Sequence, residues 1–502
     1  MRIRLPSRRS ISALTSGALT PLSLAPLSWW PVAIITTAAL HLLIQGQRPR
    51  AAFATAYWFG FGMFATGASW VYVSIHQYGD ARMALAGALT LAFVAGLAAI
   101  FALPLALCGV LDARRPAVAL LGFPALWVLG EWWRGWILTG FPWLYLGYGA
   151  IDTWLAGWAP IGGVLGISGL LAYCGALSAT LLRMLAKREL SMPVASIGVG
   201  AAVLAWVAGG QLQARAWTTP NPDAALTIAL VQPAEPQATR WSPRALPDIL
   251  ANFSATTRGL WENDLIIWPE SGIPRLQRYV QTYLDKLDAE ARSRHVGLIT
   301  GIPTEAQPHQ YFNSALAIGT AQGVYHKRHL VPFGEYVPLE SWLRGAIAFF
   351  DLPMSAFSSG PPQQPPIAVG AISVATALCY EVAYPDLVAA DAGNAQLLLT
   401  LSNDTWFGDS LGPHQHLQMA QMRALENGKP LLRATNDGIT AFIDVHGAVR
   451  QRLPQFEAGV LRVEVTPYAG ATPFSRWGST PTVALSLALF LLALSLGHSS
   501  RH

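Results

Sequence analysis

One of the three cysteines in this sequence could act as a nucleophile. Cys108 and Cys174 lie in long apolar stretches, where a cysteine usually serves as a small buried hydrophobe. Cys379 stands alone in a more polar region, between the apolar run 371–378 and a polar turn. A residue at the end of a buried strand combines a rigid backbone with an accessible side chain, so Cys379 is a candidate reactive thiol. An inert buried cysteine is the alternative.

Two other segments could activate such a thiol. A thiol attacks as a thiolate, and its ordinary pKa of about 8.5 means that it needs a base or a nearby cation. An apolar run ends in Trp-Pro-Glu at Glu270, where the proline stops the strand from continuing. The loop 325–338, held rigid by proline and glycine, carries Lys327 and then Glu335. Taken singly, each is also what a solvated strand end or surface loop contains.

These residues belong to a block, 213–476, in which strand-like and helix-like segments alternate. Helical spacing predicts helices over 280–294 and 413–427, and turn signals lie at 321–323 and 446–447. The pattern predicts a layered α/β or α+β domain of about 260 residues, large enough for its own core. Strands are expected at 226–231, 265–268, 296–301, 313–318, 372–378, 397–401, 431–434, 441–445 and 460–465.

The rest of the chain has the composition of a membrane protein. Overall, 52% of the residues are hydrophobic and 12% charged, against about 25% charged in an ordinary soluble domain. A span needs about 20 apolar residues, and the sequence predicts eight, or seven if the first, interrupted by Pro21 and Pro26, is discounted. The predicted domains are 1–212 with seven spans, 213–476, and 477–502 with the last span and a short tail. The spans are expected at 10–27, 28–46, 51–75, 83–111, 116–136, 158–186, 193–212 and 478–498.

The distribution of basic residues predicts the orientation. With a cytoplasmic N-terminus, twelve Lys and Arg residues fall in inner segments and only Arg82 and Arg134 in the outer loops of the spans. Because positive residues favour the inside, 213–476 is expected outside the cytoplasm. The net charge of +5 does not indicate a nucleic-acid partner, since the basic excess lies in the apolar parts and forms no stripe along a phosphate backbone.

Two charged residues at the outer end of one span, Glu131 and Arg134, lie one turn apart beside tryptophans. We expect an interfacial pair at the helix end, with a lipid head-group contact as the alternative. The spans show no ladder of buried carboxylates and no paired broken helices, so the pattern gives little support to a transporter.

The histidines His414 and His416 have a spacing that could suggest a metal site. No third ligand or Cys/His cluster accompanies them, and a proline directly before them marks a helix start, so we expect neither a metal nor a cofactor. Further along this helix, Arg423 and Glu426 can pair at i,i+3, and with Asn427 they are expected to be structural.

Four motifs together indicate a family. They are Trp-Pro-Glu, Lys-Arg-His-Leu-Val-Pro-Phe-Gly-Glu-Tyr-Val-Pro, Cys-Tyr-Glu and Ser-Asn-Asp-Thr-Trp-Phe-Gly. In this order they resemble the nitrilase superfamily of Glu–Lys–Cys amidases and acyl transferases. With the flanking spans, the whole chain resembles the membrane-embedded branch of that superfamily, the apolipoprotein N-acyltransferases. The resemblance implies a helical membrane bundle joined to an extracytoplasmic α-β-β-α sandwich.

The resemblance also implies roles for individual residues. Glu270 matches the general base, Lys327 the catalytic lysine and Cys379 the nucleophile of the family. Supporting positions are Glu335, Tyr380 and Glu381, and substrate-contacting positions are Trp241 and Trp406. The apolar stretch 340–357, with Trp342, Phe349 and Phe350, is expected to form an interfacial lid, an ordinary core helix being the alternative.

The implied reaction places the protein in the bacterial inner membrane with a periplasmic catalytic domain. A phospholipid similar to phosphatidylethanolamine would donate an acyl chain to Cys379, and a diacylated apolipoprotein would accept it, by ping-pong kinetics. The alternatives are a membrane-tethered amidase or nitrilase and a non-catalytic transporter or lipid-binding protein. The intact Glu270 and Lys327 argue against a non-catalytic protein, and the number of spans argues against an amidase or nitrilase, which would need only one anchor.

Overall fold

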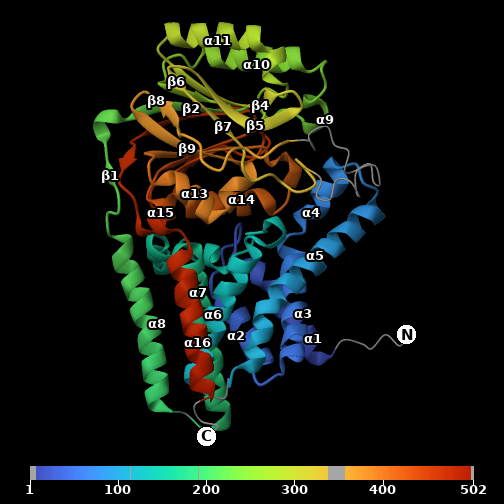
Figure 1. Ribbon diagram of the computed structural model, residues 1–502, viewed down its shortest axis with the longest axis vertical. Coiled ribbons are helices and arrows are strands. Elements are labelled where there is room, and N and C mark those ends of the chain that lie inside the picture. The colour runs from blue at the N-terminus through green and yellow to red at the C-terminus, as the bar shows by residue number, and fades with distance from the viewer. Residues whose placement is uncertain (1–6, 113–114, 190, 337–356, 499–502) are drawn as a thin grey trace. The chain divides into compact units, whose positions relative to one another are not determined.

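The computed structural model divides into two compact units, one helical and one built on β-sheets (Figure 1). The structure describes residues 7–112, 115–189, 191–336 and 357–498. The helical unit comprises Met1–Tyr72, Met83–Arg215 and Trp477–His502, and the sheet unit comprises Val73–Arg82 and Ala216–Arg476.

In the helical unit, a helix lies in each of the eight apolar stretches of the sequence. Five helical segments of the described chain are long and apolar enough to cross a membrane. The number of spans remains a prediction, because the helices in the first three stretches do not meet that measure. The helices are α1 (Arg8–Leu19), α2 (Pro31–Ile44), α3 (Pro49–Gly67), α4 (Trp70–Val73), α5 (Met83–Ala106), α6 (Pro116–Arg134), α7 (Ala159–Lys187), α8 (Met192–Gln213) and α16 (Thr480–His498).

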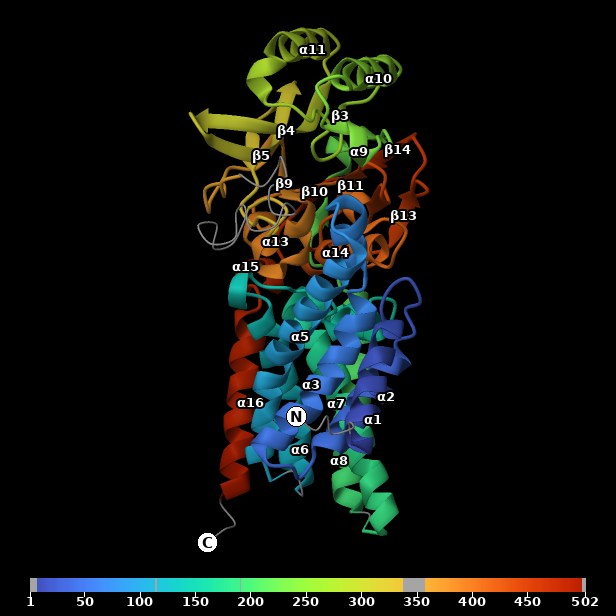
Figure 2. The same ribbon diagram turned by 90° about the vertical axis from the view of Figure 1, so that its right-hand side faces the viewer.

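Helix α3 packs against both α1 and α5 (Figure 2). The approach to α1 is close because glycines face the neighbouring backbone. A Cβ atom on Gly17 would lie 1.9 Å from the carbonyl oxygen of Phe59, and one on Gly62 would lie 2.1 Å from that of Leu14. Small residues at a helix contact allow this approach, which is the usual basis of helix packing in membranes.

The prediction for the charged residues at the end of α6 is wrong. Glu131 and Arg134 are each only 1% exposed. Glu131 accepts hydrogen bonds from the Leu146 backbone (2.7 Å) and the Trp127 indole (3.0 Å), and Arg134 donates to the Phe141 carbonyl (2.6 Å). The chain after α6 folds back over the end of the helix, and the two charged side chains bind the backbone of this returning segment. A buried charge needs such hydrogen-bond partners.

The sheet unit contains two large sheets. In the six-stranded sheet, the strand order is β14-β2-β3-β4-β5-β7, with β2, β3 and β4 parallel. In the seven-stranded sheet it is β13-β12-β11-β10-β9-β8-β6, with β9, β10 and β11 parallel. The strands are β2 (Leu226–Gln232), β3 (Leu265–Ile267), β4 (Gly297–Gln307), β5 (Gln310–Gly319), β6 (Ala321–Gln322), β7 (Val324–His326), β8 (Ile367–Val369), β9 (Ile372–Leu378), β10 (Leu397–Ser402), β11 (Leu431–Thr435), β12 (Ala441–Ile443), β13 (Val449–Arg452) and β14 (Gly459–Val465), with a separate pair β1 (Thr219–Pro220) and β15 (Tyr468–Ala469).

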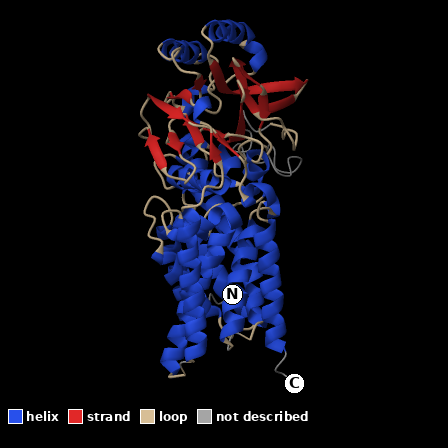
Figure 3. Ribbon diagram, turned by 90° about the vertical axis from the view of Figure 1, so that its left-hand side faces the viewer, coloured by secondary structure: helices blue, strands red, loops and turns tan. Residues whose placement is uncertain are grey.

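The two sheets face each other across one apolar core, and helices cover their outer faces (Figure 3). Along β2, Ile228 and Leu230 point into the core between the sheets, whereas Ala229 and Val231 pack under α10 and α11, as the two-residue period of a strand requires. This arrangement confirms the α-β-β-α sandwich. The helices of this unit are α9 (Gln237–Arg240), α10 (Leu246–Arg258), α11 (Gln281–Ser293), α13 (Pro385–Ala392), α14 (Gly412–Asn427) and α15 (Pro473–Trp477).

All nine strands expected from the sequence are present, as are the helices predicted over 280–294 and 413–427. The helices α10 and α13 and the short strands β8 and β13 were not predicted. The expected turn at 321–323 contains β6, because Ala321 and Gln322 pair with β8 and so form the edge of the seven-stranded sheet. The predicted pair of Arg423 with Glu426 is confirmed at 2.8 Å.

Candidate active site

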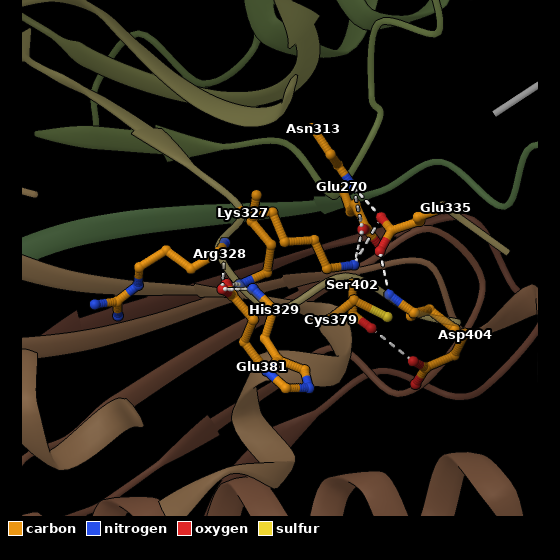
Figure 4. Close-up of polar contacts among 12 residues, drawn as sticks. Glu270, Asn313, Lys327, Arg328, His329, Glu335, Cys379, Glu381, Ser402 and Asp404 are labelled. Atoms are coloured by element: carbon orange, nitrogen blue, oxygen red, sulfur yellow. Dashed lines mark hydrogen bonds and ion pairs between the residues drawn. The ribbon is translucent and has the colours of Figure 1, made fainter. Parts of the chain in front are cut away.

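The three candidate reactive residues from the sequence lie where the two sheets meet. Glu270 follows β3, Lys327 follows β7 and Cys379 follows β9. The first two strands belong to the six-stranded sheet and the third to the seven-stranded sheet. Figure 4 shows the side chains of Glu270 and Lys327 gathered above the sulfur of Cys379. Residues more than 100 positions apart in the sequence are therefore brought together by the facing of the sheets.

Lys327 lies between two carboxylates, and we refer to Glu270, Lys327 and Glu335 as the lysine cluster. The ammonium donates to Oε1 of Glu335 at 2.9 Å and to Oε1 of Glu270 at 3.3 Å, and the Lys327 side chain is 1% exposed. Burial alone would lower the pKa of Lys327, but the carboxylates of Glu335 and Glu270 outweigh it and raise that pKa above its ordinary value. The lysine therefore carries a charge at neutral pH.

Sequence reasoning missed Asn313, which joins the two carboxylates. Its amide donates to Oε1 of Glu270 and to Oε1 of Glu335, each at 2.8 Å. Its backbone carbonyl accepts from the N–H of Lys327 at 2.8 Å, because β5 and β7 are antiparallel neighbours. The signal that could have found it is a polar amide at the start of the predicted strand 313–318. The backbone of Val331 adds a donor to Glu335 at 2.8 Å.

Cys379 has a backbone conformation that is rare for a residue other than glycine. Its φ is +50°, in the left-handed region that non-glycine residues rarely adopt and that is common at functional turns. The residue is partly exposed, and desolvation by the groups packed around it is the largest influence raising the pKa of its thiol. The negative charge of Glu270 raises that pKa further, and Lys327 opposes the shift. The resting thiol is therefore protonated at neutral pH and needs a base to react.

Glu381 connects the cysteine strand to the lysine loop. Its carboxylate accepts from the Leu378 backbone (2.7 Å), the Arg328 backbone (2.8 Å) and the His329 backbone (3.1 Å). Both of its oxygens also accept from the hydroxyl of Tyr325 at 3.0 Å. Figure 4 shows Glu381 below Arg328 and His329. Burial raises the pKa of Glu381, while the backbone N–H groups oppose this shift. The residue thus fixes the distance between the two halves of the site.

A second polar group lies on the other side of Cys379, and we refer to Asp404, His416 and Arg433 as the aspartate cluster. Asp404 pairs with Arg433 at 2.5 Å and with Nδ1 of His416 at 3.0 Å, and all three side chains are fully buried. The hydroxyl of Ser402 donates to Asp404 at 2.7 Å. Although burial alone raises the pKa of Asp404, Arg433 and His416 outweigh it and hold the pKa well below its usual range. The sequence offered one signal for this cluster, the pair His414 and His416, which was interpreted only as a possible metal site.

The remaining predicted residues have separate surroundings. Trp241 follows α9 with its indole N–H buried, and within the described structure that N–H has no hydrogen-bond partner. Trp406 packs against Tyr78, with ring centroids 6.0 Å apart. Tyr380 stacks edge-on against Tyr384 at 5.1 Å. The structure brings neither tryptophan into a hydrogen bond with the lysine cluster among the residues it describes. The predicted lid residues Trp342, Phe349 and Phe350 lie outside the described residues.

Comparison with known proteins first defines the class. Residues 227–474 match the carbon-nitrogen hydrolase family, and residues 16–177 match the apolipoprotein N-acyltransferase N-terminal domain. Among solved structures, a carbon-nitrogen hydrolase from Helicobacter pylori G27 covers 53% of this chain and 94% of its own, with 16% identity and a TM-score of 0.38. By its match to the carbon-nitrogen hydrolase family, the sheet unit is a nitrilase-like domain.

Full-length relatives then define the family. The apolipoprotein N-acyltransferase of Azotobacter vinelandii is 46% identical over 97% of this chain and 94% of the relative. That of Vibrio cholerae is 41% identical over 94% of both chains. The chain belongs to the apolipoprotein N-acyltransferase family, and it is a membrane-associated acyltransferase of the nitrilase superfamily.

Proposed function

We propose that this protein transfers a fatty acyl chain from a phospholipid, through a thioester on Cys379, to the α-amine of a diacylglyceryl-cysteine at the N-terminus of a lipoprotein. It would do so in the bacterial inner membrane, with the sheet unit on the periplasmic side. The observation that carries the proposal is the lysine cluster, in which one ammonium is held by two carboxylates beside a lone cysteine. In a membrane chain of this family, that arrangement supports acyl transfer.

In the first half-reaction, Glu270 takes the proton from the Cys379 thiol, and the sulfur attacks an ester carbonyl of the phospholipid. The C–S bond forms as the carbonyl oxygen becomes an oxyanion. Lys327 and the backbone N–H of Tyr380 would stabilise this oxygen, and one such contact is worth about 2.7–4 kcal/mol. When the C–O bond breaks, the proton on Glu270 goes to the departing lyso-phospholipid oxygen, leaving the thioester.

In the second half-reaction, the neutral α-amine of the lipoprotein attacks the thioester. Glu270 removes a proton from the nitrogen as the C–N bond forms, and the thiolate of Cys379 leaves and regains that proton. Glu335 does not react in this scheme. Its contact with Lys327 at 2.9 Å keeps the ammonium charged and in place while Glu270 changes its protonation state. Two half-reactions at one sulfur predict ping-pong kinetics.

The test uses purified full-length protein, a phospholipid with a labelled acyl chain and a diacylated lipopeptide. The wild type is expected to form a hydroxylamine-sensitive acyl-enzyme from phospholipid alone and to pass the label to the lipopeptide. Cys379→Ala is expected to do neither, whereas Cys174→Ala, the matched control, retains both. A labelled thioester on Cys379→Ala would refute the assignment. Hydrolysis of small amides without acyl transfer would indicate an amidase, and the absence of both reactions would indicate a non-catalytic protein.

A further inference from the structure

A histidine outside the lysine cluster holds the backbone of the nucleophile. His416 lies on α14, is fully buried, and its Nε2 lies 3.1 Å from the carbonyl oxygen of Cys379. A carbonyl oxygen can only accept a hydrogen bond, so Nε2 must carry the proton. The helix layer is thereby connected directly to the peptide bond between Cys379 and Tyr380.

The contacts of the other ring nitrogen, Nδ1, keep a hydrogen on Nε2 whether the imidazole is neutral or protonated. Nδ1 of His416 lies 3.1 Å from Nη2 of Arg433, a donor, and 3.0 Å from Oδ1 of Asp404, an acceptor. In the neutral ring, Nδ1 accepts from Arg433. In the protonated ring, Nδ1 donates to Asp404. In both cases Nε2 bears a hydrogen, so the aspartate cluster selects the form of His416 that donates to Cys379.

The carbonyl of Cys379 and the N–H of Tyr380 belong to one planar peptide unit, in which they point in opposite directions. A hydrogen bond to the carbonyl therefore also fixes the direction of the N–H. This support is needed because the φ of Cys379 is +50°, a conformation that is unfavourable for a residue other than glycine and persists only when its surroundings enforce it. Donation to the carbonyl also polarises the peptide, which makes its N–H a better donor.

We propose that His416 is a positioning residue for acyl transfer, orienting the Cys379–Tyr380 peptide so that its N–H binds the oxyanion. The inference rests on the proposed function, since only a reaction at a carbonyl forms an oxyanion. Losing an oxyanion donor outright costs about 10²–10³-fold in rate. Losing its support alone should cost less, about 10-fold to 100-fold.

Two amide substitutions separate this role from a merely structural one. The amide of glutamine reaches the position of Nε2, whereas that of asparagine, one bond shorter, reaches only that of Nδ1. Both variants are polar and uncharged, and asparagine is smaller than glutamine by one methylene group, so the alkylation described below is needed to detect damage from the lost volume. We expect His416→Asn to slow acyl-enzyme formation and transfer to the lipopeptide by the same factor of about 10 to 100, with the KM for phospholipid unchanged. His416→Gln should stay within a few-fold of the wild type in both steps.

Alkylation of Cys379 by iodoacetamide provides the second readout. The sulfur forms a bond to carbon, iodide leaves, and the thiol proton is released, so no oxyanion develops. Alkylation at Cys379, followed by peptide mass spectrometry, is expected to proceed at the wild-type rate in both His416 variants. The matched controls are His414→Asn and His414→Gln, which change a partly exposed histidine on the same helix and should alter neither reaction.

The inference is overturned if His416→Asn transfers acyl chains at the wild-type rate, or if His416→Gln is as slow as His416→Asn. It is also overturned if alkylation falls in parallel with acyl transfer, because that result would indicate general damage or loss of thiol activation. Failure of the proposed function looks different, since the wild type itself would then form no acyl-enzyme from phospholipid while still being alkylated.

Discussion

The lysine cluster and the aspartate cluster lie on opposite sides of the same cysteine, and both are buried, but their charges balance differently. The lysine cluster sets one ammonium against two carboxylates. The aspartate cluster sets one carboxylate against a guanidinium and an imidazole. Burial, and then the charge of Arg433, lower the pKa of this imidazole. The first therefore has a carboxylate in excess, which can take up a proton while the ammonium stays paired. The second has no excess charge and can only orient its neighbours.

The largest expected effect comes from removing the excess carboxylate. Glu270→Gln keeps the shape of the side chain but cannot accept the thiol proton. We expect acyl-enzyme formation to fall by about 10²–10⁴-fold, the usual contribution of a general base, measured by single-turnover labelling with phospholipid. Glu262→Gln, which changes an exposed carboxylate, is the control. Acyl-enzyme formation at more than a tenth of the wild-type rate in Glu270→Gln would assign the base elsewhere.

Removing the cation of the lysine cluster should instead destabilise the fold. Lys327→Met leaves two buried carboxylates facing each other, and breaking a buried pair in this way costs about 3–5 kcal/mol. One carboxylate can take up a proton as the pH falls, so the loss of Tm relative to the wild type should shrink between pH 8 and pH 4. Thermal unfolding of the purified protein measures it, with the exposed Lys286→Met as control. A loss of Tm that is independent of pH would contradict this account.

In the aspartate cluster, the destabilisation caused by Asp404→Asn should also become smaller as the pH falls, but for a different reason. The pKa of Asp404 is held below its ordinary value, so its contribution to stability is present above about pH 4 and is lost as the pH falls through the folded pKa. We expect a cost of about 2–3 kcal/mol at pH 7, typical of a hydrogen bond to a charged group. The difference in Tm from the wild type should therefore narrow in acid. A difference that widens there would show that this carboxylate is not stabilised by its neighbours.

The smallest effect concerns Asp437, a buried carboxylate beside the aspartate cluster. Burial, and then the charge of Asp404, raise the pKa of Asp437 to about 6. A raised carboxylate pKa means that stability is lost as the pH rises through 6, so Asp437→Asn should raise the stability at pH 8 by about 1–2 kcal/mol and change little at pH 4. Tm values at the two pH values check this. Equal stabilisation at both would show that the charge is not the cause.

Local patterns were sufficient for the strands and for the chemistry-bearing residues at their ends. The mostly apolar runs 226–231 and 372–378 identify strands, because one face of each sheet packs on the core and the other under helices, so both faces are apolar. The lone Cys379 stands out because of its position after such a strand. Asn313 offered only a weak signal, a polar amide at the start of a strand, and only the folded chain shows that this amide reaches two carboxylates.

Charged residues were misjudged where the chain folds back on itself. Glu131 and Arg134 were expected at an interface because a charge at a helix end is usually solvated. Their backbone partners, Leu146 and Phe141, come from the segment after the helix, and no spacing rule anticipates such contacts. His416 was similarly evaluated only against a metal, whereas its partners come from three other segments: Cys379 directly follows β9, Asp404 lies after β10, and Arg433 lies within β11.

Composition and short-range periodicity are enough to separate the apolar helical part of the chain from a layered α/β part, and the family resemblance of the motifs adds the sandwich and the glutamate, lysine and cysteine. Which polar groups share a hydrogen bond, and hence that one buried cluster has an excess carboxylate while the other is balanced, follows only from the folded chain. Hydrogen bonds act over about 3 Å, and neighbours at that distance are set by how sheets and helices pack, not by their order along the chain.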